Sequence, residues 1–151
     1  MLRYANMNVN PKNRKTADCS TRAIVATLGI SYENALNLQC KAAIKTCYGI
    51  TTKEVIEAVL KEFGWEKMKQ PKRPNGKKYL VRELDEILTP EQMKNGVLVT
   101  MANHCSCVKD GELQDTWNCG CKSVGNYFVK VRDVNPPCEK ENKRYIRMIE
   151  L

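Results

Sequence analysis

The chain has 151 residues, and its 25 Lys and Arg against 17 Asp and Glu give a formal net charge of +8. Hydrophobic residues make up 42% and charged residues 28%, which excludes a disordered tail and a membrane-embedded protein. No apolar run approaches the roughly 18 residues of a membrane-spanning helix, and the N-terminus lacks the apolar core of a secretory signal. We therefore expect a single cytoplasmic domain over residues 1–151, with a basic surface that favours an acidic partner.

The N-terminal half reads as a polar arm followed by helices. Residues 1–18 form the arm, and apolar residues at helical spacing predict a helix that starts at Cys19 and stops at Gly29. Ser31 has the character of an N-cap for a second helix, which runs to about Tyr48.

A third helix and a basic loop complete this half. Thr51 and Glu54 have capping-box spacing ahead of apolar residues at helical period, and Gly64 closes that helix. Residues 67–78 contain two prolines and an Asn-Gly pair, so they predict a basic loop. A short helix is expected after it and ends before Pro90.

Strand signals dominate the C-terminal half. Asp110-Gly111 is the strongest hairpin signal in the chain, because both residue types suit a two-residue turn. The predicted fold class is α+β, with an N-terminal helical layer packed on a small C-terminal antiparallel sheet. The expected strands cover 97–102, a second run to Val108, 112–117, 125–131 and 144–149.

Cys19 stands at the first turn of the first predicted helix, between the polar residues Asp18 and Ser20. Backbone N–H groups and the positive end of the helix dipole stabilise a thiolate at such a position. The alternative is a small buried core residue, since cysteine is among the most often buried residue types. The polar neighbours favour the reactive thiol.

The chain contains one histidine, His104, and the hairpin register predicts a carboxylate beside it. With Asp110-Gly111 as the loop, His104 lies diagonal to Asp115 on one face of the hairpin. Trp117 lies directly opposite His104 and would shield the pair from water. The alternative is a solvated histidine with an accidental neighbour.

Cys19, His104 and Asp115 would together supply a nucleophile, a base and a group that orients the base. Such a set forms an acyl-thioester, and the reaction also needs hydrogen-bond donors for the developing oxyanion. The backbone N–H of Cys19 is one candidate donor. The side chain of Asn13, six residues upstream, is another.

The order Cys, His and then Asp-Thr-Trp at 115–117 resembles the papain-like cysteine peptidase superfamily, where an amide side chain six residues before the nucleophile helps to bind the oxyanion. The segments NPKNRKTADCSTRAIVATLGISYENAL and VKDGELQDTWNCGCKSVGNYF are similar to small papain-like proteins of bacteriophages and their bacterial hosts. Over residues 8–131 the resemblance implies a papain-like fold, although Asn103 stands where Gly usually precedes the histidine. The implied catalytic residues are Cys19, His104 and Asp115, and the implied supporting residues are Asn13 and Trp117.

Two close cysteine pairs, Cys105-x-Cys107 and Cys119-x-Cys121, raise the alternative of a zinc site. Structural zinc sites usually leave two to four residues between paired ligands, so the spacing argues against it. We expect no metal and no other cofactor. The other interpretation, small buried hydrophobes, is what we expect of four cysteines: Cys40, Cys47, Cys105 and Cys107.

The expected function is a papain-like thiol hydrolase (a cysteine peptidase, isopeptidase or amidase) that acts on a protein or peptide, in the cytoplasm of a bacterial host if the chain is phage-encoded. The alternative is a non-catalytic papain-fold binding protein, such as a viral antagonist of a host protein or nucleic acid. An acyl transferase of the transglutaminase type would use the same triad with an amine acceptor. Because the basic loop 67–78 lacks interleaved aromatics, we expect a solvated loop there and no nucleic-acid partner. No membrane partner is expected, because no long apolar run is present.

Overall fold

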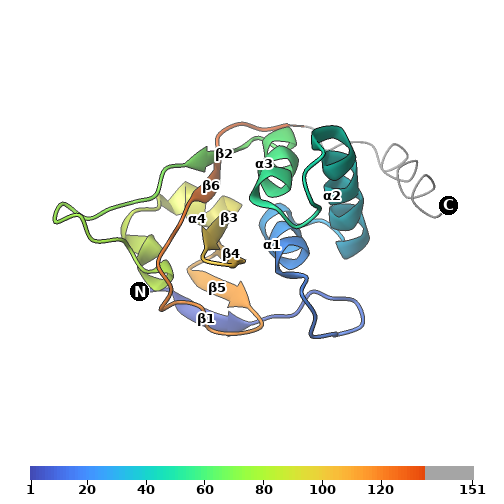
Figure 1. Ribbon diagram of the computed structural model, residues 1–151. Coiled ribbons are helices and arrows are strands. Elements are labelled where there is room, and N and C mark those ends of the chain that lie inside the picture. Colours follow the sequence, from blue (N-terminus) through green and yellow to red (C-terminus); the bar gives the residue numbers. More distant parts are fainter. Residues whose placement is uncertain (135–151) are drawn as a thin grey trace.

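A computed structural model describes residues 1–134 as a six-stranded sheet with helices on both of its faces (Figure 1). One face carries α1 (Cys19–Leu28), α2 (Tyr32–Thr46) and α3 (Lys53–Glu62), and the other carries the 3₁₀ helix η1 (Val81–Glu86) and α4 (Pro90–Asn95). The strands are β1 (Arg3–Asn6), β2 (Trp65–Met68), β3 (Val97–Met101), β4 (His104–Lys109), β5 (Glu112–Asp115) and β6 (Tyr127–Lys130), in the spatial order β1-β5-β4-β3-β6-β2. The predicted α+β class is confirmed at this level.

Two further expectations concern a C-terminal strand and the absence of membrane-spanning helices. The strand expected at 144–149 lies outside the described residues. Within residues 1–134, no helix combines the length and the apolar character needed to cross a membrane.

The three long helices begin and end largely where local sequence signals predict. Gly29 ends α1 in the left-handed conformation (φ 66°), and its N–H donates to the carbonyl of Val25. Ser31 caps α2, because its hydroxyl accepts from the N–H of Asn34. The N-cap of α3 is Thr52 and not Thr51, so that prediction was wrong by one residue.

The two hairpins β3–β4 and β4–β5 have the tight turns that position the site. Asp110 and Gly111 both have positive φ (52° and 77°), as a type I′ turn requires. The register that follows pairs Lys109 with Glu112 and Cys107 with Gln114, as predicted. Asn103 also has a positive φ of 55°. Asn is among the non-glycine residues that adopt this conformation most readily, so it suits the turn between β3 and β4.

Three expectations about segments were incomplete. The arm 1–18 contains β1, which pairs in parallel with β5, so the sheet is mixed and not purely antiparallel. The basic loop 67–78 starts inside β2, which pairs with β6. Pro90 does not merely limit the short helix η1 but opens a further one, α4, at the position where its missing N–H costs nothing.

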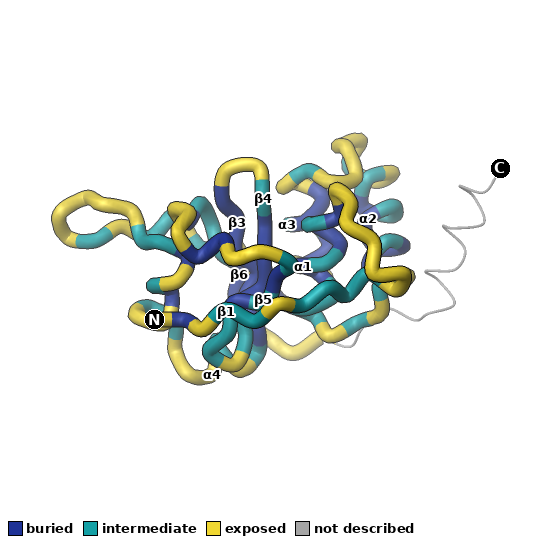
Figure 2. The backbone as a smooth tube through the Cα atoms, turned by 90° about the horizontal axis from the view of Figure 1, so that it is seen from below, coloured by how far each residue is buried: buried dark blue, intermediate teal, exposed yellow. Residues whose placement is uncertain are grey.

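Burial on both faces of the sheet holds β4 and β5 in place. Leu98, Cys105 and Phe128 pack against α1 and α3 on one face. Val99 and Val108 belong to the second cluster, under η1 and α4. Figure 2 shows β3, β4 and β6 as the buried centre of the molecule.

The four cysteines expected in the core differ in how far they are buried. Cys105 and Cys107 are buried, with 5% and 0% of their surface exposed, as predicted. Cys40 is half-buried. Cys47 is exposed, because it ends α2 in the left-handed conformation (φ 60°) at the surface, so the prediction of a buried Cys47 was wrong.

Candidate active site

The start of α1 sets the environment of Cys19, the first residue of that helix. Asp18 occupies the N-cap position, but its carboxylate does not cap the helix. It accepts instead from the Nε of Arg22 at 2.7 Å and from the hydroxyl of Tyr32 at 2.8 Å. The first N–H groups of α1 are therefore left without a side-chain cap, and such groups favour an anion at Cys19.

His104 and Asp115 form the pair that the hairpin register predicts. The Nε2 of His104 lies 2.6 Å from the Oδ2 of Asp115, a hydrogen-bond distance. The ring of Trp117 lies against the imidazole, with 4.9 Å between the ring centroids. Although burial of the imidazole opposes it, hydrogen bonds to Asp115, Cys119 and Cys19 raise the pKa of His104 to about 11.

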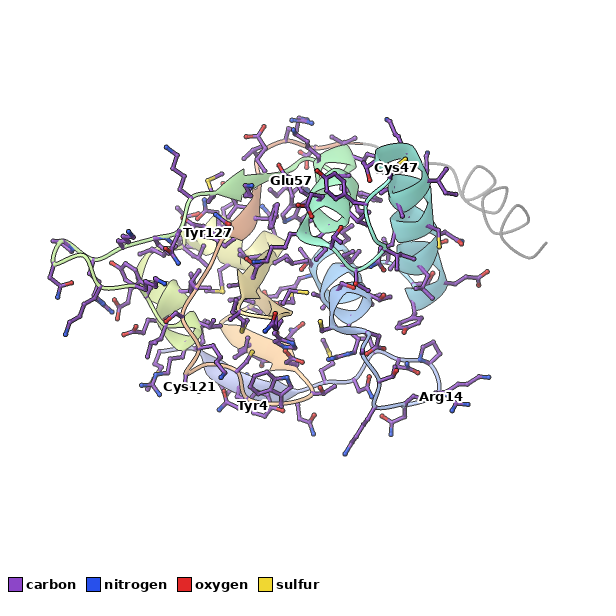
Figure 3. All side chains as sticks on the ribbon, viewed as in Figure 1. Tyr4, Arg14, Cys47, Glu57, Cys121 and Tyr127 are labelled. Atoms are coloured by element: carbon purple, nitrogen blue, oxygen red, sulfur yellow. The ribbon has the colours of Figure 1, made fainter. Side chains whose placement is uncertain are left out.

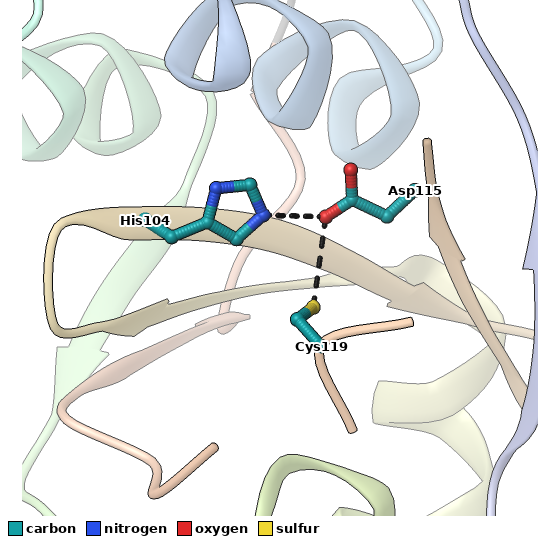
Figure 4. Close-up of side chains that lie close together, drawn as sticks. All are labelled: His104, Asp115 and Cys119. Carbon is teal, nitrogen blue, oxygen red and sulfur yellow. Dashed lines mark hydrogen bonds and ion pairs between the residues drawn. The ribbon is translucent and has the colours of Figure 1, made fainter. Parts of the chain in front are cut away.

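Asp115 is the hub of a buried hydrogen-bond network and is only 3% exposed. Its Oδ1 accepts from Nη1 of Arg22 at 2.9 Å and from the N–H of Thr116 at 2.7 Å. Its Oδ2 accepts from His104 and from the thiol of Cys119, whose Sγ is 3.6 Å away (Figure 4). Burial opposes ionisation, but these donors outweigh it and hold the pKa of Asp115 well below its usual range.

The Cys19 thiol is correspondingly acidic. Hydrogen bonds from the Cys105 thiol and from His104 lower the pKa of Cys19 to about 4, against the opposing effect of burial. Because Nε2 of His104 is engaged by Asp115, its other nitrogen, Nδ1, is the one left for Cys19. The same contact with Cys19, together with burial, raises the pKa of Cys105 well above its ordinary value. The lowered pKa of Cys19 and the raised pKa of His104 both favour a thiolate–imidazolium ion pair at neutral pH.

An open cleft gives access to this ion pair from two directions. The larger lobe has a volume of about 570 Å³ and is lined in part by Lys15 and Trp117. The smaller lobe has a volume of about 310 Å³ and reaches the first turns of α3 at Ile56. Cys19 and His104 line both lobes, so a chain laid along the cleft would cross the thiolate.

Asn13 is the candidate residue that the structure does not bring to the cleft. It lies exposed on the loop before α1, where its side-chain oxygen accepts from Asn8 at 3.2 Å. The amide side chain that lines both lobes is instead Asn103, next to His104. Sequence spacing alone does not reveal the path of the loop, and this path moves Asn13 away.

Sequence reasoning assigned no role to three residues that contact the triad: Arg22, Cys105 and Cys119. A signal existed for Arg22, which stands four residues after Asp18 on one helix face. Cys105 was expected to be only a core residue. Cys119 follows the end of β5, and no local pattern predicts that the chain there turns back toward Asp115.

Within residues 1–134, one group of side chains could offer several ligands to a metal ion. The donor atoms of His104, Asp115 and Cys119 lie within 4.8 Å of one another. Two ligands of a tetrahedral zinc ion lie about 3.3 Å apart, whereas His104 and Asp115 are at 2.6 Å. The group as arranged is a hydrogen-bond network. Of the paired cysteines, Cys121 is exposed, unlike its buried partner Cys119.

Comparisons with protein-family models, with curated proteins and with solved structures found no match. The fold and the site together define an α+β protein in which Cys19 and His104 line an open cleft and Asp115 is buried behind them. The chemistry that follows is argued from that geometry.

Proposed function

We propose that the protein is a thiol hydrolase that cleaves an amide bond in a protein or peptide through an acyl-thioester on Cys19. The observation that carries the proposal is the imidazole of His104, held by Asp115 at 2.6 Å and hydrogen-bonded to a thiol at a helix N-terminus. Each member of this set has the neighbour that its chemical role requires.

In the first half-reaction the Cys19 thiolate attacks the carbonyl carbon of the substrate. The resulting oxyanion is stabilised by the uncapped backbone N–H groups at the start of α1. The imidazolium of His104 then gives its proton to the departing amine as the C–N bond breaks. The products of this step are a free amine and a thioester on Cys19.

In the second half-reaction the now neutral His104 takes a proton from a water molecule, and the hydroxide attacks the thioester. The C–S bond breaks, which releases a carboxylic acid and regenerates the thiolate. Asp115 remains ionised throughout because its donors hold its pKa low, and it stabilises the imidazolium each time it forms.

A papain-like architecture belongs to the same proposal. It is supported by a nucleophile at the start of a helix that packs on β4, while the His and the acid lie on the sheet. The positive φ of Asn103 supports it as well, since that position in the resembling proteins is usually Gly. A catalytic thiolate must stay reduced, which fits the cytoplasm of a bacterial host.

Cleavage by the full-length protein tests the proposal directly. A mixture of cell-derived peptides is incubated with the protein or with a Cys19→Ala variant, and new termini are identified by mass spectrometry. We expect cleavage products that require Cys19. In water enriched with ¹⁸O, each new carboxylate gains one heavy oxygen, because water is the acceptor.

A matched control is Cys47→Ala, which removes an exposed thiol that lines neither lobe of the cleft. This substitution leaves the triad intact. It should cleave as the unaltered protein does. Equal product patterns from the Cys19→Ala variant would contradict the proposal and favour a non-catalytic binding protein. Products that carry an added amine and no heavy oxygen would instead indicate an acyl transferase.

A further inference from the structure

We propose that the larger lobe of the cleft selects a substrate with an acidic residue close to the bond that is cleaved. The inference rests on the proposed function, because it concerns how a substrate would lie beside Cys19. The carboxylate would be held by Arg14 and Lys15, which line this lobe together with Cys19 and His104.

Within the described part of the chain, the positive charges of Arg14 and Lys15 in the larger lobe are not neutralised by neighbouring carboxylates. Among residues 1–134, no carboxylate forms an ion pair with Arg14 or Lys15. The other charged pair in the lobe, Asp18 and Arg22, is joined by its own salt bridge at 2.7 Å. Two unmatched positive charges therefore face the space beside the thiolate. Figure 3 shows Arg14 extending from the loop that precedes α1.

Trp117 gives the same lobe an apolar wall. Its side chain is 40% exposed, although one side of it lies against His104. A large aromatic ring left open beside a catalytic pair suits contact with the stem or backbone of a bound chain. The lobe thus offers an apolar surface next to two cations, which matches the methylene stem and carboxylate of Glu or Asp.

The smaller lobe differs in charge. Its one charged lining residue, apart from the Cys19–His104 pair, is Lys53. Lys53 also lines an adjoining hollow with Glu54, Glu57 and Lys67, and there Glu57 pairs with Lys67 at 3.4 Å. The smaller lobe thus has one such cation, against Arg14 and Lys15 in the larger lobe. We therefore expect selection for an acidic residue on the side of the larger lobe only.

Two alkylating reagents of nearly equal size test the inference without knowledge of the substrate. Iodoacetate carries a carboxylate and iodoacetamide does not, and both alkylate thiolates. We expect the double variant Arg14→Gln/Lys15→Gln to lower the ratio of iodoacetate to iodoacetamide rates about fivefold, as two charges acting across a water-filled cleft would. At about 1 M salt the difference should largely vanish, because the Debye length falls to roughly 3 Å.

The matched control is Lys72→Gln/Lys77→Gln, which removes two exposed positive charges from the basic loop 67–78. Its rate ratio should equal that of the unaltered protein. If both double variants lower the ratio equally, net charge and not the lobe attracts the anion, and the inference is wrong. The inference is also wrong if neither double variant changes the ratio while Cys19 is still the most reactive thiol. If Cys19 does not react ahead of the other cysteines, the proposed function fails, and the inference fails with it.

Discussion

The two ends of the interface between α1 and β4 hold cysteines of opposite acidity. Cys19 at the start of α1 has a pKa of about 4, whereas Cys107, beside Thr27 near the end of α1, has a pKa of about 11. Burial acts in the same direction on both thiols, since it disfavours the anion. Burial is the largest influence at Cys107, which is fully buried, and it outweighs the hydrogen bonds that Cys107 receives. At half-buried Cys19, the hydrogen bonds of Cys105 and His104 outweigh burial.

This comparison shows what makes a partly buried cysteine acidic. A thiol in a packed interior is inert unless charged or polar groups favour its anion more than burial opposes it. Here those groups form a chain from Cys19 through His104 and Asp115 to Arg22. Substitutions among these hydrogen-bonded groups should raise the pKa of Cys19 toward that of Cys107.

The largest effect is expected from Asp115→Asn. Both carboxylate oxygens accept hydrogen bonds, and Asn has only one acceptor oxygen. Its NH₂ group must therefore face either Arg22, which cannot accept, or His104, which would accept only in the other tautomer. We expect Cys19-dependent peptide cleavage to fall roughly 10⁴-fold, because the imidazole is then held in the wrong tautomer. The free energy of unfolding should fall by about 1.5–3 kcal/mol, as for the loss of a hydrogen bond to a charged group. Cleavage at the original rate would show that Asp115 does not orient His104.

A smaller effect is expected from His104→Ala on alkylation of Cys19 by iodoacetamide. Without the imidazolium, the pKa of Cys19 moves up toward the ordinary value of about 8.5, so the thiolate becomes scarce at pH 6. Alkylation should slow roughly 100-fold at pH 6 and little at pH 9, where the thiol ionises unaided. Cys47 serves as the internal control, since its rate should not change. Equal slowing at both pH values would indicate a steric effect and not an electrostatic one.

The next prediction compares Cys105→Ala with Cys107→Ala, which change two buried thiols of β4. Cys105→Ala removes a donor to Cys19, so the pKa of Cys19 should rise and its alkylation at pH 5 should slow several-fold. Cys107→Ala creates a similar cavity two residues away but touches none of the groups at Cys19. It should leave that rate unchanged. Equal slowing by both variants would mean that packing, and not the Cys105 thiol, controls the nucleophile.

The smallest effect is expected from a chelator. Because His104 and Asp115 are joined by a hydrogen bond at 2.6 Å, removal of metal should change neither the melting temperature nor the alkylation of Cys19. Elemental analysis provides the second readout. Near one zinc per chain, with a marked loss of stability on chelation, would show that Cys119 and its neighbours bind a metal, because structural zinc contributes about 10–16 kcal/mol in small domains.

Local sequence signals were enough to predict the His104–Asp115 pair and the helix that starts at Cys19. Asp110-Gly111 determines the register of β4 and β5, and this register alone puts His104 beside Asp115. The helix that starts at Cys19 follows from apolar periodicity and from Gly29. These features depend on residues close together in the chain, where turn type and period act directly.

The remaining features depend on contacts between distant segments, which local patterns do not encode. Arg22 and Asp115 are 93 residues apart in sequence. The parallel pairing of β1 with β5 likewise joins distant parts of the described chain. The loop that follows β1 brings Arg14 and Lys15 to the cleft but leaves Asn13 exposed outside its lining. No periodicity or capping signal specifies such a path, so the expected role of Asn13 rested on spacing alone.

The most direct test of the account is the acidity of Cys19 itself. Thiolates absorb near 240 nm, so the difference in absorbance between the unaltered protein and Cys19→Ala, followed from about pH 3 to pH 10, reports the ionisation of this one thiol. The predicted result is a thiolate that forms with a midpoint near pH 4 and persists through neutral pH. A midpoint near 8.5, the value of an ordinary cysteine, would contradict the claim that the site holds an activated nucleophile.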